Sequence, residues 1–212
     1  MKTNPTVTVL DYGIGNVRSI LNALENVGCT ATLTRDTVAI LESDALILPG
    51  VGAFKSGMDN LLKFHLDELI HDFVSTGKVF IGICLGMQMM FEESEEFGIT
   101  KGLSLVEGKV KKLKKENENR LPNVSWNRLI EPQFNRWENT LLQNSVAKEN
   151  FYFIHSFVGV PSNHSDILAK SGYGSIEFCA AVQNKNMYGF QFHPEKSGND
   201  GLNIFRNLKT IL

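Results

Sequence analysis

Apolar runs alternate with amphipathic stretches through the first half of the chain. Short runs rich in β-branched residues predict buried strands, and stretches with apolar residues at helical spacing predict helices. Strands are predicted over 6–10, 29–34, 45–48 and 79–83, and helices over 17–27, 61–74 and 85–91. Asp36 is suited to cap a further short helix. Because strands and helices alternate, this half predicts a parallel sheet with right-handed crossovers.

The pattern changes after residue 100. Positions 103–113 alternate between apolar and polar, and 109–120 is rich in charge, which predicts strands joined by an exposed loop. The remaining predicted elements are strands over 151–157, 178–182 and 187–192, a tight turn at 184–186, and a closing helix over 198–212. No linker and no repeat interrupts the chain. We therefore expect residues 1–212 to form one α/β domain with an antiparallel extension.

Length and charge narrow the class of protein. The 212 residues suffice for a sizeable core, and the formal net charge of −2 gives no electrostatic case for binding nucleic acid or an anionic membrane. No apolar run approaches the ~20 residues of a membrane-spanning helix. Residues 1–5 lead into a strand without the apolar core of a signal peptide. These features predict a cytoplasmic protein.

The three cysteines, Cys29, Cys84 and Cys179, lie far apart and include no Cys-x-x-Cys pair. This spacing argues against a disulfide framework and against a zinc site, and it favours a reducing compartment. His65 and His71 fall on the solvated side of the predicted helix 61–74 and are assigned no function. No metal or other cofactor is predicted.

The stretch from Lys78 to Gln88 is the strongest candidate for chemistry. A buried strand runs into Cys84, and a helix is predicted directly after it. Gly82 and Gly86 flank Cys84, as a sharp turn without room for a Cβ requires. The arrangement matches the Gly-x-Ser-x-Gly nucleophile elbow with Cys in place of Ser, and the N–H groups that begin the helix favour the thiolate. The alternative is a buried Cys that packs as a small hydrophobe.

Two glycine-rich turns follow earlier strands. Gly13 and Gly15 suggest a dinucleotide-binding loop, but Arg18 stands where the third glycine belongs and no acidic residue ends the second strand. A helix-entry loop that can face a partner is the better interpretation. Residues 49–54 (PGVGAF) follow the third strand, at the sheet edge where ligands bind in open α/β folds. Their amides can form an oxyanion hole, and a simple turn is the alternative.

The last predicted strand ends in His193, Pro194 and Glu195. Residues two apart in extended chain point the same way, so His193 and Glu195 can share a side. A nucleophilic Cys needs a base, and the base needs a partner that fixes its tautomer. An isolated motif of this kind is more often a surface turn. Here it ends a strand at the same sheet edge as the elbow and the 49–54 loop, which favours a catalytic site.

In combination, these motifs resemble those of the class I (triad) glutamine amidotransferases. The resemblance depends on GICLGMQ at 82–88 and FHPE at 192–195. More specifically, DYGIGN at 11–16, PGVGAF at 49–54, His155-Ser156 and QFHPEKSG at 191–198 resemble the glutaminase subunits of imidazole glycerol phosphate synthase. The resemblance covers nearly the whole chain. It implies a three-layer fold with a mixed, mostly parallel central sheet, flanking helices and an antiparallel extension.

The resemblance also implies the chemistry. Cys84 would attack the side-chain amide carbon of L-glutamine, His193 would take and return the proton, and Glu195 would orient His193. The implied oxyanion and substrate-binding residues are Gly50, Val51, Gly52, Leu85, Gln88, Glu96 and Ser156. The ammonia would pass, within a heterodimer, to a synthase subunit that is a HisF-like (β/α)8 barrel. There it would help form imidazole glycerol phosphate and the purine-pathway ribonucleotide AICAR in histidine biosynthesis.

One segment departs from the pattern of these subunits. They usually read PHMGWN where this chain has PNVSWN at 122–127, and the segment resembles a region that faces the synthase. The presence of Trp126 in a polar setting is typical of a partner-facing or hydrogen-bonded position. The departure leaves the glutaminase residues unchanged but opens a second possibility for the acceptor. Similar paralogues are associated with a synthetase that amidinates sugars in surface polysaccharide biosynthesis.

Two further classes compete with this interpretation. Cysteine hydrolases and stress proteins with a similar elbow commonly place His directly after the Cys, whereas Leu85 follows Cys84 here and His193 lies far downstream. A non-enzymatic binding module would not require Cys84, His193 and Glu195 together. A glutaminase assay with the partner present separates an enzyme from a binding module.

Overall fold

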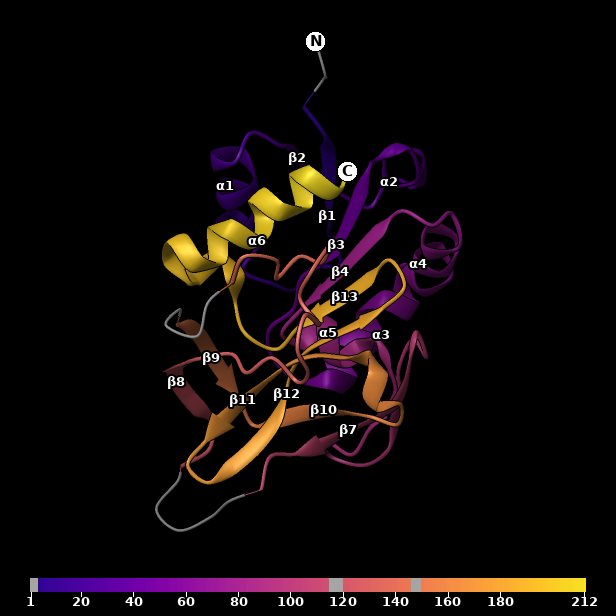
Figure 1. Cartoon of the computed structure of the whole chain (residues 1–212). Coiled ribbons are helices and arrows are strands. Elements are labelled where there is room, and N and C mark those ends of the chain that lie inside the picture. Colours follow the sequence, from indigo (N-terminus) through magenta and orange to yellow (C-terminus); the bar gives the residue numbers. More distant parts are fainter. Residues whose placement is uncertain (1–3, 115–119, 146–149) are drawn as a thin grey trace.

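The central feature of the protein is a seven-stranded sheet (Figure 1). The structure is a computed structural model that describes residues 4–114, 120–145 and 150–212. In spatial order the strands are β11 (Ile167–Tyr173), β12 (Ile176–Asn184), β13 (Met187–Phe190), β4 (Val79–Ile83), β3 (Ala45–Leu48), β1 (Thr6–Leu10) and β2 (Thr30–Thr34). From β13 to β2 all neighbours are parallel, whereas β12 and β11 are antiparallel to theirs. The predicted mixed, mostly parallel sheet is confirmed.

Helices cover both faces of this sheet, which gives three layers. One face packs against α1 (Val17–Asn26) and α6 (Gly198–Ile211), and the other against α2 (Thr37–Glu42), α3 (Phe54–Lys63), α4 (Leu66–Ser75) and α5 (Leu85–Met89). Strand β3 contributes Ala45 and Ile47 to the first core and Leu46 and Leu48 to the second, as the two-residue period of a strand requires. All four of its residues are buried, which explains its unbroken apolar sequence.

The extension consists of two smaller sheets. One has four strands, β10 (Phe157–Pro161), β7 (Val106–Lys112), β5 (Phe91–Ser94) and β6 (Thr100–Lys101). Its β5–β7 pair is parallel and its other two pairs are antiparallel, so this sheet is mixed. The other pairs β8 (Asn123–Asn127) with β9 (Phe151–His155), and we call it the β8–β9 ribbon. The charged stretch 109–120 begins in β7, and its residues 115–119 lie outside the described part of the chain. The ribbon therefore begins after the charged stretch in the sequence.

Several local predictions were confirmed and others were wrong. Asp36 caps α2, since its Oδ1 accepts a hydrogen bond from the Ala39 amide at 2.9 Å. The single helix expected over 61–74 is instead two helices, because His65 between α3 and α4 adopts a left-handed backbone with φ 54°. The helix expected to reach Phe91 ends at Met89, and Phe91 begins β5. The strand expected over 151–157 is divided at Ser156 into β9 and β10.

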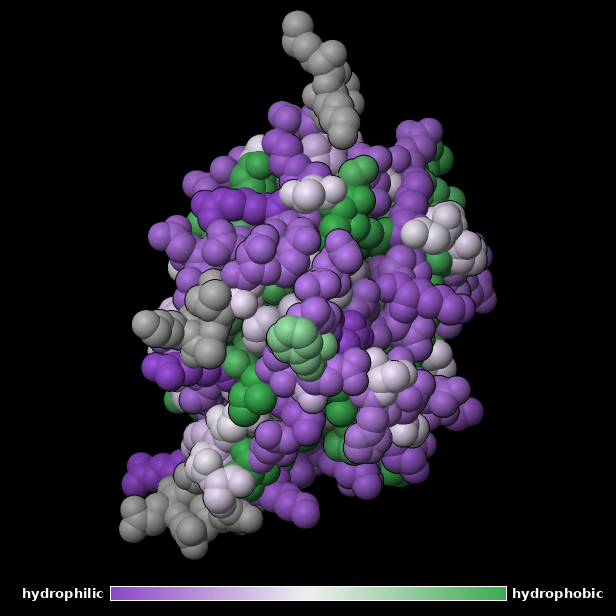
Figure 2. Space-filling model, viewed as in Figure 1, coloured by the Kyte–Doolittle hydropathy of each residue, from purple (hydrophilic) through white to green (hydrophobic). Residues whose placement is uncertain are grey.

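The acidic run from Glu92 to Glu96 is only partly a solvated face. Glu92 accepts from the Gly108 amide at 2.8 Å, and Glu96 accepts from the Phe54 amide at 2.7 Å. The second contact satisfies a free N–H at the start of α3, whose own cap residue Ala53 makes no side-chain bond. In the described ranges no helix is long and apolar enough to cross a membrane. The face shown in Figure 2 is mostly hydrophilic, with small separated apolar groups.

Candidate active site

The predicted elbow is present at the end of β4. Cys84 joins β4 to α5 with φ 53° and ψ −107°, a conformation that a residue other than glycine adopts only under strain. A Cβ on Gly86 would lie 2.0 Å from the Leu48 carbonyl oxygen, and one on Gly82 would lie 2.7 Å from the backbone of Gly86. Both glycines are therefore required by packing. The Cys84 amide donates to the Phe190 carbonyl at 2.7 Å, which places the nucleophile beside the end of β13.

His193 and Glu195 follow β13 and lie next to the elbow. His193 Nδ1 is 2.8 Å from Glu195 Oε1, and the two side chains are 2% and 1% exposed. A carboxylate only accepts, so Nδ1 carries the proton and Nε2 is left for exchange with the sulfur. Burial alone would lower the pKa of His193. Cys84 and Glu195 beside it have the larger, opposite effect and raise the pKa to about 10. The raised pKa favours the imidazolium form of His193 beside the Cys84 sulfur.

A cavity of about 310 Å³ opens beside Cys84 and His193. Most of the predicted oxyanion and substrate residues lie on its wall: Val51, Gly52, Leu85, Gln88, Glu96 and Ser156. Gly50 does not line the cavity. A Cβ at Gly50 would lie 2.8 Å from the Gly86 nitrogen, so this residue packs against the elbow instead. The structure thus brings residues from the loop after β3, the elbow and α5, the segment after β5 and the β9–β10 junction to one cavity.

The 49–54 loop is anchored by a hydrogen bond at Pro49, and there is free space around its Gly52. Tyr12 Oη donates to the Pro49 carbonyl at 2.6 Å in the buried interior. The Leu85 amide, an expected oxyanion donor, donates to the Gly50 carbonyl in a long bond of 3.4 Å. Gly52 has φ 103°, which only glycine adopts readily, and no atom would lie within 4 Å of an added Cβ. The Gly52 end of the loop therefore has open space around it.

Two buried glutamines lie behind the nucleophile. Gln88 Nε2 is 3.0 Å from both the Phe157 carbonyl and Gln191 Oε1, and Gln191 Nε2 is 3.7 Å from Cys84 Sγ. Both Gln88 hydrogens are thus used within the protein, which leaves its Oε1 for a substrate. Sequence reasoning assigned Gln191 no separate role. Its position two residues before His193 in extended chain was the available signal that both face the site.

The ribbon adds a second histidine to the cavity wall. His155 Nδ1 lies 3.0 Å from the Phe157 carbonyl, and its Nε2 lies 3.0 Å from Asn123 Nδ2. A carbonyl only accepts and this amide nitrogen only donates, so His155 is neutral with the proton on Nδ1. Burial lowers the pKa of His155 to about 4. Sequence reasoning missed the contact between Asn123 and His155, because it depends on the pairing of β8 with β9.

The other cysteines lie in unreactive surroundings. All three cysteines are free; burial raises the pKa of Cys29, and it raises the pKa of Cys179 to about 12. Only Cys84 lies beside a His–Glu pair. Among the described residues, no group of three His, Cys, Asp or Glu side chains could hold a metal ion.

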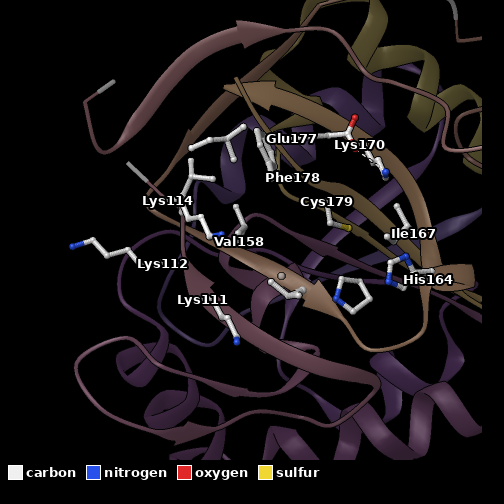
Figure 3. Close-up of a pocket in the computed structure, with 15 residues that line it drawn as sticks. Lys111, Lys112, Lys114, Val158, His164, Ile167, Lys170, Glu177, Phe178 and Cys179 are labelled. Carbon is white, nitrogen blue, oxygen red and sulfur yellow. Dashed lines mark hydrogen bonds and ion pairs between the residues drawn. The ribbon is translucent and has the colours of Figure 1, made fainter. Parts of the chain in front are cut away.

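A second cavity, of about 380 Å³, lies away from the triad between β7, β10 and the β11–β12 edge (Figure 3). Its rim carries several lysines over an apolar floor that includes Val158 and Phe178. Lys170 is paired with Glu177 at 2.7 Å, and Lys112 points away from the cavity. The lysine charges do not converge on one point, so the cavity has no built anion site.

Comparison with known proteins agrees with the geometry. Residues 8–210 match the family described as glutamine amidotransferase class-I. The chain is 39% identical over 211 residues to imidazole glycerol phosphate synthase subunit HisH 1 of Legionella pneumophila (strain Lens), covering 97% of this chain and 99% of that protein. It is 44% identical over 202 residues to subunit HisH of Bacillus subtilis (strain 168), covering 93% and 92%.

Solved structures show the same fold at lower identity. A putative GMP synthase subunit from Thermoplasma acidophilum has a TM-score of 0.72 at 20% identity, covering 100% of this chain and 95% of that chain. PurLQS from Thermotoga maritima has a TM-score of 0.72 at 21% identity, covering 97% of each chain. These similarities support the three-layer architecture over almost the full length of the chain.

Proposed function

Because the chain belongs to the class I glutamine amidotransferase family, we propose that it is the glutaminase subunit of an imidazole glycerol phosphate synthase. In this role it releases ammonia from L-glutamine and delivers it to a synthase subunit in histidine biosynthesis. The observation that carries the proposal is that Cys84 and His193 line one cavity and that Glu195 is bonded to His193. Two HisH relatives at 39% and 44% identity support the choice of pathway.

The geometry supports a two-stage hydrolysis. The Cys84 thiolate attacks the amide carbon, and the carbonyl electrons move to oxygen. As the C–N bond breaks, His193 donates its proton to the leaving nitrogen, and ammonia departs from a thioester. Water then attacks the thioester with His193 as base, the S–C bond breaks, and glutamate leaves. Glu195 keeps Nδ1 of His193 protonated through both stages, so that Nε2 exchanges the proton.

We infer that the predicted oxyanion hole is closed in this arrangement of the loop. The Leu85 amide donates to Gly50 instead of pointing at an empty position. Turning the peptide between Gly50 and Val51 would withdraw that carbonyl and aim the Val51 amide at the cavity. Removing one oxyanion donor in other enzymes costs about 10²–10³ in rate. A partner that favours the turned peptide would therefore switch on glutamine hydrolysis when an acceptor for ammonia is in place.

The outer face of the ribbon is the surface that suits the synthase. Val124 and Trp126 are 54% and 55% exposed, and Ile154, which also lines the cavity, is 39% exposed. The Trp126 ring lies 5.6 Å from that of Tyr152. Exposed aromatic and aliphatic groups beside an active site are typical of a partner interface. Asn123, the first residue of the departure at 123–125, is buried and faces His155 instead. The departure therefore has an inward part at Asn123 and an outward part at Val124, and only the outward part can contact a partner.

The proposal is tested by separating ammonia production from ammonia use. In the complex with the synthase, Cys84→Ala should lower glutamine-dependent product formation by several orders of magnitude, because the nucleophile is lost. High free ammonium at alkaline pH should restore product formation, because the synthase is intact. Cys179→Ser is the matched control and should keep glutamine-dependent activity. Failure of ammonium to rescue Cys84→Ala would contradict the proposal.

A further inference from the structure

A row of side-chain amides connects the Cys84 sulfur to a backbone carbonyl. Gln191 Nε2 lies 3.7 Å from Cys84 Sγ, a normal length for a hydrogen bond to sulfur, and Gln191 Oε1 lies 3.0 Å from Gln88 Nε2. The second hydrogen of Gln88 points to the Phe157 carbonyl, also at 3.0 Å. Gln191 is fully buried and Gln88 is 6% exposed. Water therefore does not compete for these bonds.

The direction of the row is fixed at its far end. A backbone carbonyl can only accept, so the Gln88 nitrogen, not its oxygen, must face Phe157. The same nitrogen then donates to Gln191, which must present its oxygen to Gln88. Gln191 therefore turns its NH₂ group toward Cys84. The reversed amide of Gln191 would bring two nitrogens together at Gln88 and aim an oxygen at the sulfur.

We propose that Gln191 is a further catalytic residue whose side-chain N–H donates to the Cys84 sulfur and stabilises its thiolate, with Gln88 as the positioning residue that orients it. The inference deepens the proposed glutaminase and rests on the same nucleophile. A thiolate has only lone pairs, so a fixed donor favours it over the thiol. The donor acts again when the thioester breaks, because the sulfur then recovers its negative charge.

The test follows alkylation of Cys84 by iodoacetamide from pH 5 to pH 10, read by mass spectrometry of the Cys84 peptide. Thiolate is the reactive species, so the pH midpoint of the reaction reports its stabilisation. Gln191→Met keeps the length of the side chain but removes the donor, and it should raise the midpoint by about one to two pH units. Gln88→Met should raise it by less, because Gln191 can still reach the sulfur without being held.

Two further variants separate the loss of the hydrogen-bond donor from other effects of a substitution. Gln191→Glu preserves shape and replaces the donor with a carboxylate oxygen, so it should raise the midpoint more than Gln191→Met. Gln183→Met alters a glutamine of β12 that bonds Tyr188 and Arg136, and it should leave the midpoint unchanged. An unchanged midpoint in folded Gln191→Met or Gln191→Glu overturns the inference. Alkylation needs neither glutamine nor a synthase, so failure of the proposed function would not mimic that result.

Discussion

The elbow at Cys84 and the β8–β9 ribbon border the same cavity, yet they are built in opposite ways. At the elbow, the backbones of β4, α5 and the end of β3 approach so closely that one added carbon at Gly86 would meet the Leu48 carbonyl. On the ribbon, Val124 and Trp126 leave more than half of their surface exposed. The elbow holds a strained backbone through packing, whereas the outer ribbon is free to meet another surface.

The reaction requires one geometry at the elbow, whereas the outer face of the ribbon can vary with the partner that binds there. A nucleophile must stay within a fraction of an ångström of its productive position, so its surroundings tolerate no change. The two faces of the ribbon have different surroundings. Asn123 and His155 face inward and bond to one another, whereas Val124 and Trp126 alternate with them toward the outside. Departures from the family pattern at 123–125 can therefore occur without touching the triad.

The largest effect is expected from breaking the elbow. Gly86→Ala should destabilise the fold by more than about 3 kcal/mol, because the clash is with backbone and no rotamer relieves it. Gly172→Ala in β11 is the matched control, since its Cβ would lie 3.8 Å from the nearest atom, the Ile176 carbonyl oxygen. Urea denaturation of the two variants gives the comparison. Equal stabilities would mean that the elbow is not held by packing.

The elements with strong patterns could be predicted from the sequence. The strands at 6–10, 45–48 and 79–83 have the predicted bounds, because the first alternates between polar and apolar residues and the other two are short apolar runs. The break at His65 could not be predicted, since neither Gly nor Pro marks the left-handed residue there. The helix after Cys84 was predicted too long. Met90 and Phe91 are as apolar as the helix before them, and only pairing with β7 reveals a strand.

In the candidate site, too, some features could be predicted from the sequence and others could not. Cys84, His193 and Glu195 follow strands directly, so sequence order predicts that they meet at one sheet edge. The roles of Gln191 and of the Asn123–His155 pair depend on contacts across 107 and 32 residues, respectively. No local periodicity encodes such contacts. The Gly50 carbonyl at the Leu85 amide is likewise a matter of peptide orientation, which the glycines permit but do not specify.

His155, on the inner face of the ribbon, should make the free energy of unfolding depend on pH in the acid range. Burial lowers the pKa of His155 to about 4, below the ordinary value near 6.5, so the unfolded chain binds this proton first as the pH falls. The stability is present above pH 6.5 and is lost as the pH falls from 6.5 through 4. In His155→Gln the amide can keep both hydrogen bonds without titrating. Between pH 7 and pH 4 the wild type should lose about 3 kcal/mol more than this variant. Equal losses by urea denaturation would contradict the neutral, buried His155.

The outer face of the ribbon should matter only when the synthase is present. Trp126→Ala removes an exposed aromatic beside the cavity and should weaken binding of the synthase by about 30-fold, or about 2 kcal/mol, without changing the free energy of unfolding. Phe134→Ala is the matched control, because Phe134 is 90% exposed and lies outside the β8–β9 ribbon. Titration calorimetry measures the binding.

Glutamine turnover is then measured for the isolated chain and with increasing concentrations of the synthase. For the wild type it should rise at least tenfold. For Trp126→Ala it should reach the same level, but at a higher synthase concentration. A tight complex with Trp126→Ala would place the docking surface elsewhere, and equal turnover with and without synthase would show that the Gly50–Val51 peptide does not respond to the partner.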